Sequence, residues 1–308
     1  MPSLGPGREF DLVRALVARW GTLAAGVGDD AAVLDVPAGQ RLVASTDSAV
    51  EGVHFRREWL SPNEIGWRAA AAALSDLAAM AAEPLALLVS LSIPDAWLTE
   101  IPDLADGLGN AARAAGARIA GGDLTSAREL CIGITVLGTA RAPLLRSGAR
   151  ADDLLYVTGR LGGPLAALRA WQRGAQPAAD ARERFAHPIP RLREARWLAH
   201  HGAHAAIDVS DGLLSDAAHI AAASNVRLAI TLDALPTAGG LSPDDAARSG
   251  EEYELVVASP HALDVDEFAR RFDIPLTEIG RVQAGDAEVV ATLHGARVAS
   301  GGGFDHFS

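Results

Sequence analysis

The chain has 308 residues, of which 49% are hydrophobic and 21% charged, and these values are typical of a globular protein of two domains rather than of a disordered chain. Its net charge of −12 excludes the basic footprint that nucleic-acid binding needs, and no apolar run reaches the ~18 residues that span a bilayer. All 27 basic residues are arginine, which excludes both a G-x-x-x-x-G-K-[ST] phosphate loop and the ATP-binding lysine of protein kinases.

Helix and strand signals alternate along the first part of the chain, which favours an α/β domain. The helices predicted there span residues 10–19, 61–82 and 98–115. The predicted strands span residues 41–45, 85–93, 118–120 and 130–137. The first of these strands is expected to end in Thr46-Asp47, and the third in Gly121-Gly122-Asp123.

A second α/β series follows the segment Arg146-Ser147-Gly148-Ala149, so we place a domain boundary there and predict domains 1–146 and 147–308. Its predicted strands span residues 154–158, 205–208, 226–232, 254–258 and 287–293. Its predicted helices begin after Gly163-Pro164, near residue 191 and at residue 213.

Five motifs place an aspartate after an apolar segment, beside glycine, or on an apolar helix face, and they contain Asp30, Asp47, Asp76, Asp123, and Asp208 with Asp211. Taken singly, such residues are usually turn formers or helix caps. Asp76 is unusual, because it shares a helix face with Ile65, Ala69 and Met80, where an ionised carboxylate needs a compensating cation or donor. Together the carboxylates favour a site for hard cations, Mg²⁺ first and Mn²⁺ second.

Three weaker signals favour structural readings. The segment Gly26–Ala31 fits G-x-G-x-x-A, but an apolar β-branched run follows it rather than a helix, which argues against a dinucleotide site. His200, His201 and His204 are interpreted as a solvated helix end rather than as zinc ligands. Cys131 is alone and lies in an apolar run, so we expect a small core side chain. With no secretory signal in MPSLGPGREFD, we expect a cytoplasmic protein without nucleic-acid or membrane partners.

The motifs GVGDDAAVL, STDSAVEGVHF, ALSDLAAM, GGDLT, RSGA, IDVSDGLLSD, SGEEYEL and GFDHF occur in this order and together resemble the thiamine-monophosphate kinase family. That family belongs to the group that also contains aminoimidazole ribonucleotide synthetase. The resemblance implies a two-domain α/β fold like that of aminoimidazole ribonucleotide synthetase, with an N-terminal sheet domain that forms a homodimer and a C-terminal domain that closes the active site. It also implies ATP and thiamine monophosphate as substrates and several Mg²⁺ ions as cofactors, with Mn²⁺ as a substitute.

The same resemblance assigns roles to individual residues. The implied metal ligands are Asp30, Ser45, Thr46, Asp47, Asp76, Asp123, Asp208 and Asp211. The residues implied to contact ATP are Gly122, Arg146 and Ser210, and those implied to contact the thiamine substrate are His54, Glu251 and Phe304. The residues implied to carry catalysis are Asp47, Asp211 and Arg146. Because the attacking phosphate is already ionised near neutral pH, no general base is expected.

Three positions depart from the family's pattern. Ser249 and Glu252 stand where G-G-E-D-Y-E has a glycine and an aspartate, Ala81 stands where a glycine is usual, and Phe304 stands where tyrosine is frequent. None of these is an implied metal ligand, so the departures bear on the substrate pocket. Two alternatives remain: another ATP-using member of the same group, similar to aminoimidazole ribonucleotide synthetase, or a catalytically silent protein that binds nucleotide or metal. The cysteine-dependent branches of the group are disfavoured, because Cys131 lies at neither end of the chain.

Overall fold

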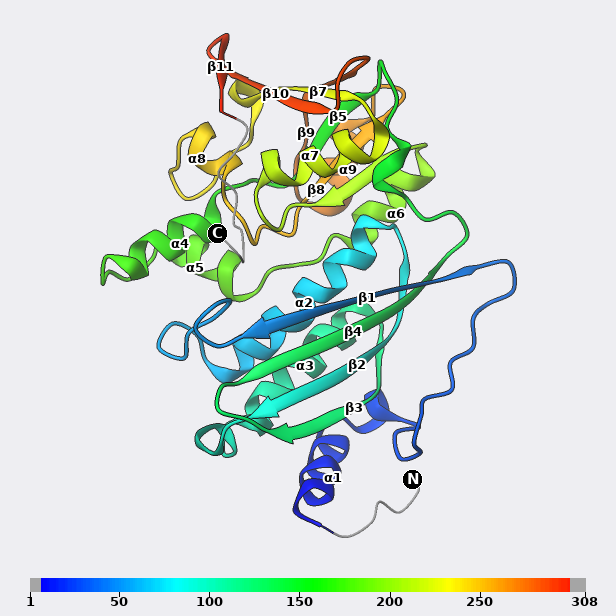
Figure 1. Cartoon of the computed structure of the whole chain (residues 1–308), viewed down its shortest axis with the longest axis vertical. Coiled ribbons are helices and arrows are strands. Elements are labelled where there is room, and N and C mark those ends of the chain that lie inside the picture. Colours follow the sequence, from blue (N-terminus) through cyan, green and yellow to red (C-terminus); the bar gives the residue numbers. More distant parts are fainter. Residues whose placement is uncertain (1–6, 300–308) are drawn as a thin grey trace. The chain divides into compact units, whose positions relative to one another are not determined.

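The computed structural model of the chain describes residues 7–299, which form two compact units, each with its own β-sheet (Figure 1). Within the described residues, the first unit comprises residues 7–77 and 82–142, and the second comprises residues 78–81 and 143–299. Within the described residues, no helix is both long enough and apolar enough to cross a membrane.

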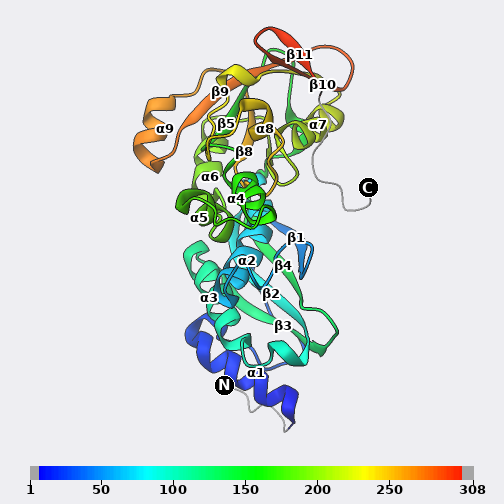
Figure 2. The same ribbon diagram turned by 90° about the vertical axis from the view of Figure 1, so that its left-hand side faces the viewer.

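The first unit is a four-stranded sheet in the order β1-β4-β2-β3, with α2 and α3 on one of its faces (Figures 1 and 2). Strands β1 and β2 are antiparallel to β4, and β3 is parallel to β2. The strands are β1 (Arg41–Val50), β2 (Glu83–Ile93), β3 (Arg118–Ser126) and β4 (Cys131–Ala140). The helices are α1 (Arg8–Trp20), α2 (Pro62–Ala79) and α3 (Ile101–Ala115), with 3-10 turns η1 (Gly21–Ala24) and η2 (Asp95–Trp97).

Strict alternation in β4 builds the core of this unit. Ile132, Ile134 and Val136 are fully buried, whereas the residues between them are partly exposed. Because side chains alternate between the faces of a strand, every second residue of β4 packs in the interior. On the first helix of the unit, Trp20 donates from Nε1 to the carbonyl oxygen of Ala105 over 2.8 Å and fixes α1 to α3.

All four strands of this unit are longer than the sequence predicted, and in two of them a local turn signal was taken for the end of the strand. The predicted end of the first strand at Thr46-Asp47 is wrong, because β1 continues to Val50 and pairs with β4 along its whole length. The predicted end of the third strand at Asp123 is also wrong, because β3 continues beside β2 to Ser126. In both strands, a neighbouring strand supplies hydrogen-bond partners for the backbone groups beyond the turn signal, so the strand continues through it.

The second unit is a seven-stranded sheet in the order β11-β10-β7-β9-β5-β8-β6. Its strands are β5 (Leu154–Thr158), β6 (Ala205–Asp208), β7 (Arg227–Thr231), β8 (Leu255–Ser259), β9 (Leu276–Gln283), β10 (Glu288–Leu293) and β11 (Ala296–Val298). Its helices are α4 (Gly163–Gln172), α5 (Ala179–Ala186), α6 (Leu192–His200), α7 (Leu213–Ser224), α8 (Pro243–Ala247) and α9 (Val265–Phe272). Its 3-10 turns are η3 (Arg146–Gly148) and η4 (Leu232–Ala234).

Helices cover both faces of this second sheet, and Figure 2 shows α7 and α9 on opposite sides of it. On one side Leu213, Ala217 and Ile220 of α7 join the core that also contains strand residues such as Ile207 and Val256. On the other side the fully buried Phe268 of α9 meets Trp197 of α6 edge to face, with ring centroids 5.3 Å apart. The α/β class predicted from the sequence is confirmed, although strands β9 and β11 and the helices α5, α8 and α9 were not predicted.

Candidate functional site

Strand β1 and helix α2 bring two of the predicted metal ligands together. The hydroxyl of Ser45 donates to Oδ2 of Asp76 over 2.5 Å. Asp47 lies two residues further along β1, so it shares this face of the sheet and is exposed. Thr46 points to the opposite face, where its hydroxyl accepts from Thr135 over 3.2 Å. Strand β1 therefore places Ser45 and Asp47 on the side of the sheet where Asp76 of α2 lies, and Thr46 on the other side.

A tight turn after β1 carries the predicted substrate ligand His54. The backbone N–H of Val50 donates to Nδ1 of His54 over 3.1 Å. Because Nδ1 accepts, the proton of the neutral ring is on Nε2. The turn is held at its base by Glu51, which accepts from Nε1 of Trp97 over 2.9 Å, and by the buried Phe55, whose ring meets Trp97 edge to face.

The remaining predicted residues of the first unit lie on exposed backbone. Asp123 is exposed on β3, beside Gly122, and a side chain at Gly122 would place Cβ 1.8 Å from the carbonyl oxygen of Val89. Gly122 therefore permits the close approach of β3 to β2. Asp30 is exposed at the start of a stretch without helix or strand. No helix follows Gly26–Ala31, in agreement with the argument against a dinucleotide site.

In the second unit, the loop after β6 holds Asp208, Ser210 and Asp211 around a carboxylate that sequence reasoning missed. Oδ2 of Asp216, in the first turn of α7, accepts three backbone N–H groups, from Ser210 at 2.9 Å and from Asp211 and Gly212 at 3.0 Å. The sequence did contain a signal for this contact, because an acidic residue in the first turn of a helix often accepts hydrogen bonds from the free backbone N–H groups at the N-terminus of that helix. Asp216 fixes the backbone of the loop that carries the predicted ligands.

Negative charge is concentrated at this loop. Burial, followed by the nearby charge of Asp208, raises the pKa of Asp216 to about 7, while the N–H groups of Asp211 and Gly212 oppose the shift. Asp208 is itself buried, with 5% of its surface exposed. A concentration of carboxylates that raises a pKa in this way is an environment that a divalent cation stabilises.

The loop of residues 249–254, which contains the predicted substrate ligand Glu251, is hydrogen-bonded directly to the Asp208–Gly212 loop. The N–H of Glu251 donates to Ser210 over 2.7 Å, and the N–H groups of Glu252 and Tyr253 donate to Val209 over 3.1 and 2.9 Å. The hydroxyl of Tyr253 then donates to Oε2 of Glu251 over 2.9 Å. The second unit thus holds Ser210, Asp211 and the Glu251 carboxylate in one assembly of two loops.

Arg146 lies in the turn η3, which is anchored to the end of α7. The hydroxyl of Ser224 donates to the carbonyl oxygen of Arg146 over 2.7 Å and accepts from the N–H of Ala149 over 3.1 Å. The Arg146 residue is exposed. The turn therefore fixes the backbone of Arg146, while the residue itself stays exposed. Phe304 lies outside the described residues.

The residue types fit magnesium, although the protein alone does not close a metal site. Among residues 7–299, no three His, Cys, Asp or Glu side chains lie close enough together to hold a metal ion. The predicted ligands are all oxygen donors, and the concentration of carboxylates at Asp208, Asp211 and Asp216 supplies the negative potential that Mg²⁺ requires.

The histidines at the end of α6 do not form a zinc site within the described part of the chain. His200 is exposed, as a solvated helix end predicts. That interpretation is wrong for the two half-buried histidines. His201 stacks on Trp197 with ring centroids 3.8 Å apart, and Nδ1 of His204 lies 3.0 Å from Oδ2 of Asp153. Both side chains are therefore structural.

Two family matches cover most of the chain. Residues 28–140 match AIR synthase related protein, N-terminal domain, and residues 150–292 match AIR synthase related protein, C-terminal domain. The order of the two matches follows the order of the two sheets along the sequence. The chain is therefore a member of the AIR synthase-related proteins.

Similar proteins identify the family within this class to which the chain belongs. The chain is 36% identical to the thiamine-monophosphate kinase of Mycobacterium tuberculosis over 305 residues, covering 94% of this chain and 89% of that protein. The solved thiamine-monophosphate kinase of Stenotrophomonas maltophilia is 35% identical with a TM-score of 0.82, covering 94% of this chain and 98% of the other. A structure described as AaThiL complexed with AMPPCP and TMP is 26% identical with a TM-score of 0.77 and 97% coverage of both chains. The chain belongs to the thiamine-monophosphate kinases, and it is an enzyme of that class.

Proposed function

We propose that this chain transfers the γ-phosphoryl group of ATP directly to the phosphate of thiamine monophosphate, giving thiamine diphosphate and ADP by in-line displacement. The observation that carries the proposal is the full-length match to a relative described as complexed with AMPPCP and TMP, since a chain that folds alike throughout has the scaffold for the same pair of ligands. In the reaction a phosphate oxygen of thiamine monophosphate forms a bond to the γ-phosphorus of ATP, and the bond from that phosphorus to the bridging oxygen of ADP breaks.

We propose that Asp30, Ser45, Thr46, Asp47, Asp76, Asp123, Asp208 and Asp211 are the residues that would hold the Mg²⁺ ions. When bound, Mg²⁺ neutralises and orients the two polyanionic substrates. Ser45, Asp47 and Asp76 support this assignment by sharing one face of the first sheet, and Asp208 and Asp211 support it by their common negative environment. Thr46 fits least well, because its hydroxyl is bonded to Thr135 on the opposite face.

The other predicted residues bind and orient the substrates. Arg146, accessible on an anchored turn, would bind phosphate oxygens of ATP, and Gly122 and Ser210 would lie against the nucleotide. His54, with its proton on Nε2, would donate to the phosphate of thiamine monophosphate. Glu251 would face the cationic thiazolium ring, with Phe304 beside it. A phosphate monoester whose second pKa is near ~6 is already largely ionised at pH 7, so none of these residues needs to remove a proton.

We also propose a homodimer formed through the first sheet. Leu42 lies on the same face of β1 as Thr46, opposite the face on which Ser45 meets α2, and it is 52% exposed. In the preceding segment, Val33 is 84% exposed. Exposed large apolar side chains on this unit support the proposal. Light scattering coupled to size exclusion tests the assignment, since a monomer at micromolar concentration contradicts it.

Turnover with purified protein tests the reaction. ATP and Mg²⁺ with thiamine monophosphate should give equal amounts of ADP and thiamine diphosphate, whereas a panel of other phosphomonoesters should give little product. Turnover of a different substrate would favour another ATP-using member of the group. A thermal shift with ATP and Mg²⁺ but no turnover of any substrate would favour a silent binding protein.

A further inference from the structure

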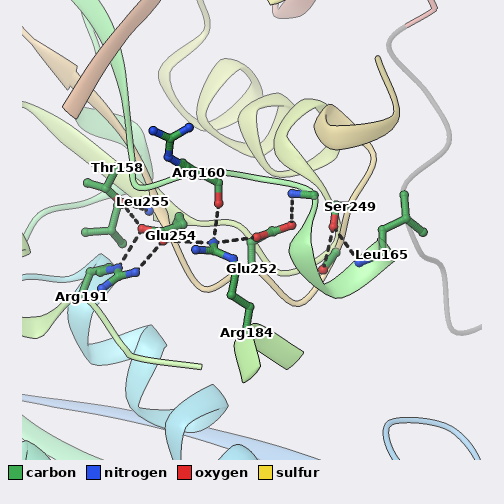
Figure 3. A network of polar contacts seen from close by, with 11 residues as sticks. Thr158, Arg160, Leu165, Arg184, Arg191, Ser249, Glu252, Glu254 and Leu255 are labelled. Atoms are coloured by element: carbon green, nitrogen blue, oxygen red, sulfur yellow. Dashed lines mark hydrogen bonds and ion pairs between the residues drawn. The ribbon is translucent and has the colours of Figure 1, made fainter. Parts of the chain in front are cut away.

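Four ionisable side chains, two from the loop of residues 249–254 and two from outside it, lie together in the second unit, and none of them was predicted to act in the reaction (Figure 3). The side chains of Glu252 and Glu254 are completely buried, and that of Arg191 is 11% exposed. Arg184, on α5, is 28% exposed. Isolated buried charges are strongly unfavourable, so such a group persists only when its members are paired and hydrogen-bonded. We call these four residues the buried network.

Glu254 is the best-satisfied member of the buried network. Arg191 donates to both of its carboxylate oxygens, from Nε over 2.8 Å and from Nη2 over 2.6 Å. Thr158 donates to the same carboxylate over 2.7 Å and accepts from the N–H of Leu255 over 2.8 Å. Burial raises the pKa of Glu254, but the charge and hydrogen bonds of Arg191 outweigh burial and the pKa is lowered. Glu254 is thus a fixed anion at the end of the loop.

Glu252 ties the loop to two helices. It accepts from the N–H of Gly162, the residue before α4, and from Nη2 of Arg184 over 3.2 Å. Nη2 of Arg184 also lies 3.4 Å from Oε1 of Glu254, so one guanidinium bridges both carboxylates (Figure 3). Ser249 adds a further tie, because its hydroxyl accepts from the N–H of Leu165 over 3.3 Å. Ser249 and Glu252, which depart from the family's pattern, are therefore the residues that attach this loop to α4.

Between these anchors the backbone is held in an unfavourable conformation. Glu251 has φ of 61° and Tyr253 has φ of 53°, both in the left-handed region that L residues other than glycine avoid. Such backbone strain persists only where surrounding contacts impose it. Glu252 and Glu254 supply those contacts, since they alternate with the two strained residues along the loop.

We propose that Arg184, Arg191, Glu252 and Glu254 are positioning residues for Glu251. They hold the left-handed backbone that presents the Glu251 carboxylate, and they set the affinity for the cationic ring of the substrate without touching it. The inference rests on the proposed function, in which Glu251 faces the thiazolium. The part of the inference that says the buried network controls the loop does not depend on the substrate.

The first measurement is substrate affinity in Arg184→Met, which removes the guanidinium that bridges both glutamates. We expect KM for thiamine monophosphate to rise roughly 5- to 20-fold and KM for ATP to stay within about 2-fold. The control is Arg227→Met, which removes an arginine of similar exposure (34%) that forms a 2.9 Å ion pair with Glu288 between β7 and β10. Because Glu288 is itself 37% exposed, this variant should lose less stability, and it should leave both KM values unchanged. If Arg184→Met does not fold, Thr158→Val removes a single donor to Glu254 and takes its place.

The second measurement is a double-mutant cycle with Glu251→Gln. If the buried network acts through Glu251, adding Arg184→Met to Glu251→Gln should change KM for thiamine monophosphate by less than about 2-fold, because the two changes share one cause. Amide exchange without substrate should accelerate in Arg184→Met at Glu251, Glu252 and Tyr253, the residues whose N–H groups are bonded to Val209 and Ser210.

Unchanged amide exchange, or effects on KM that multiply in the double mutant, would overturn the inference while the proposed function stands. A wild-type protein that does not phosphorylate thiamine monophosphate would overturn the proposed function and the substrate half of the inference together. That result is distinguishable, because it is seen before any substitution is made.

Discussion

The hydroxyl of Ser45 and the carboxylate of Asp76 are joined by a 2.5 Å hydrogen bond between edge strand β1 and helix α2. The helix face around Asp76 is otherwise apolar, with Ile65, Ala69 and Ala73 all buried. A carboxylate on such a face is expensive unless donors or cations surround it. Its position therefore points to a role in binding rather than in folding.

Asp76→Asn should lower kcat by at least ~10²-fold while the melting temperature stays nearly unchanged, because the amide keeps the shape and loses the charge. Ser45→Ala should have a smaller effect on kcat, since the Asp76 carboxylate remains. The matched control is Thr135→Val, which removes a hydroxyl from the opposite face of the same sheet. Steady-state kinetics with thermal denaturation checks all three. A fully active Asp76→Asn variant would make Asp76 a structural residue.

Asp47 and Asp211 are both proposed metal ligands, so each is expected to contribute negative charge in the reaction. Replacing either one by asparagine should reduce kcat by at least ~10²-fold, the scale of losing one electrostatic stabiliser. Asp233→Asn is a suitable control, because Asp233 is an exposed carboxylate paired with His294. If Asp47→Asn and Asp211→Asn both remain within a few-fold of the wild type, the two aspartates are turn formers only.

Metal removal should abolish the reaction. The predicted ligands are all oxygen donors, so EDTA should stop turnover, and Mg²⁺ or Mn²⁺ should restore it. The stabilisation of the fold by ATP in a thermal-shift experiment should disappear with the metal. Turnover that survives exhaustive chelation would contradict the assignment of the carboxylates.

The stability of the fold should depend on pH through Glu252. Burial raises the pKa of Glu252 to about 7 from an ordinary value of 4.5, despite the nearby charge of Arg184 and hydrogen bonds from Ser249 and Gly162. The folded state therefore holds this proton more tightly than the unfolded state. The stabilisation is complete below pH 4.5 and is lost as the pH rises to about 7.

Glu252→Gln has no such proton to lose. Its free energy of unfolding, measured by urea denaturation, should therefore rise relative to that of the wild type as the pH increases from 5 to 8. Glu254→Gln is the control. The pKa of Glu254 is lowered, so its contribution is lost only as the pH falls below the ordinary value and should be flat across the same range. Parallel profiles for Glu252→Gln and the wild type would show that Glu252 stays ionised.

Strands buried on both faces were the most predictable part of the fold. Strands β5 and β6 match their predicted bounds of 154–158 and 205–208, because every residue in them is buried and the apolar run itself marks the strand. Strand β9 (LTEIGRVQ) carries two charged residues and a glycine, so its local signal is weak. It becomes a central strand because β5 and β7 supply hydrogen-bond partners on both sides.

The candidate site was predictable only where a motif lies in one short segment. Ser45 and Asp76 were identified singly, but their contact depends on the packing of α2 against β1, which the local sequence does not indicate. The buried network was not predictable in the same way. Glutamate is rarely buried completely, and the partner of Glu254, Arg191, lies 63 positions away in the sequence.

The left-handed backbone at Glu251 and Tyr253 changes what an alanine scan of this loop measures. Alanine at position 251 removes the carboxylate but is still an L residue, so roughly 1–2 kcal/mol of backbone strain remains in the folded state. Glycine at the same position removes the carboxylate and the strain together, although it also gives the unfolded chain more freedom. The difference in stability between the alanine and glycine variants therefore measures the backbone strain of an L residue at this position. The activity that both variants lose measures the contribution of the carboxylate to substrate binding. In this loop the handedness of a residue is a variable separate from its side chain.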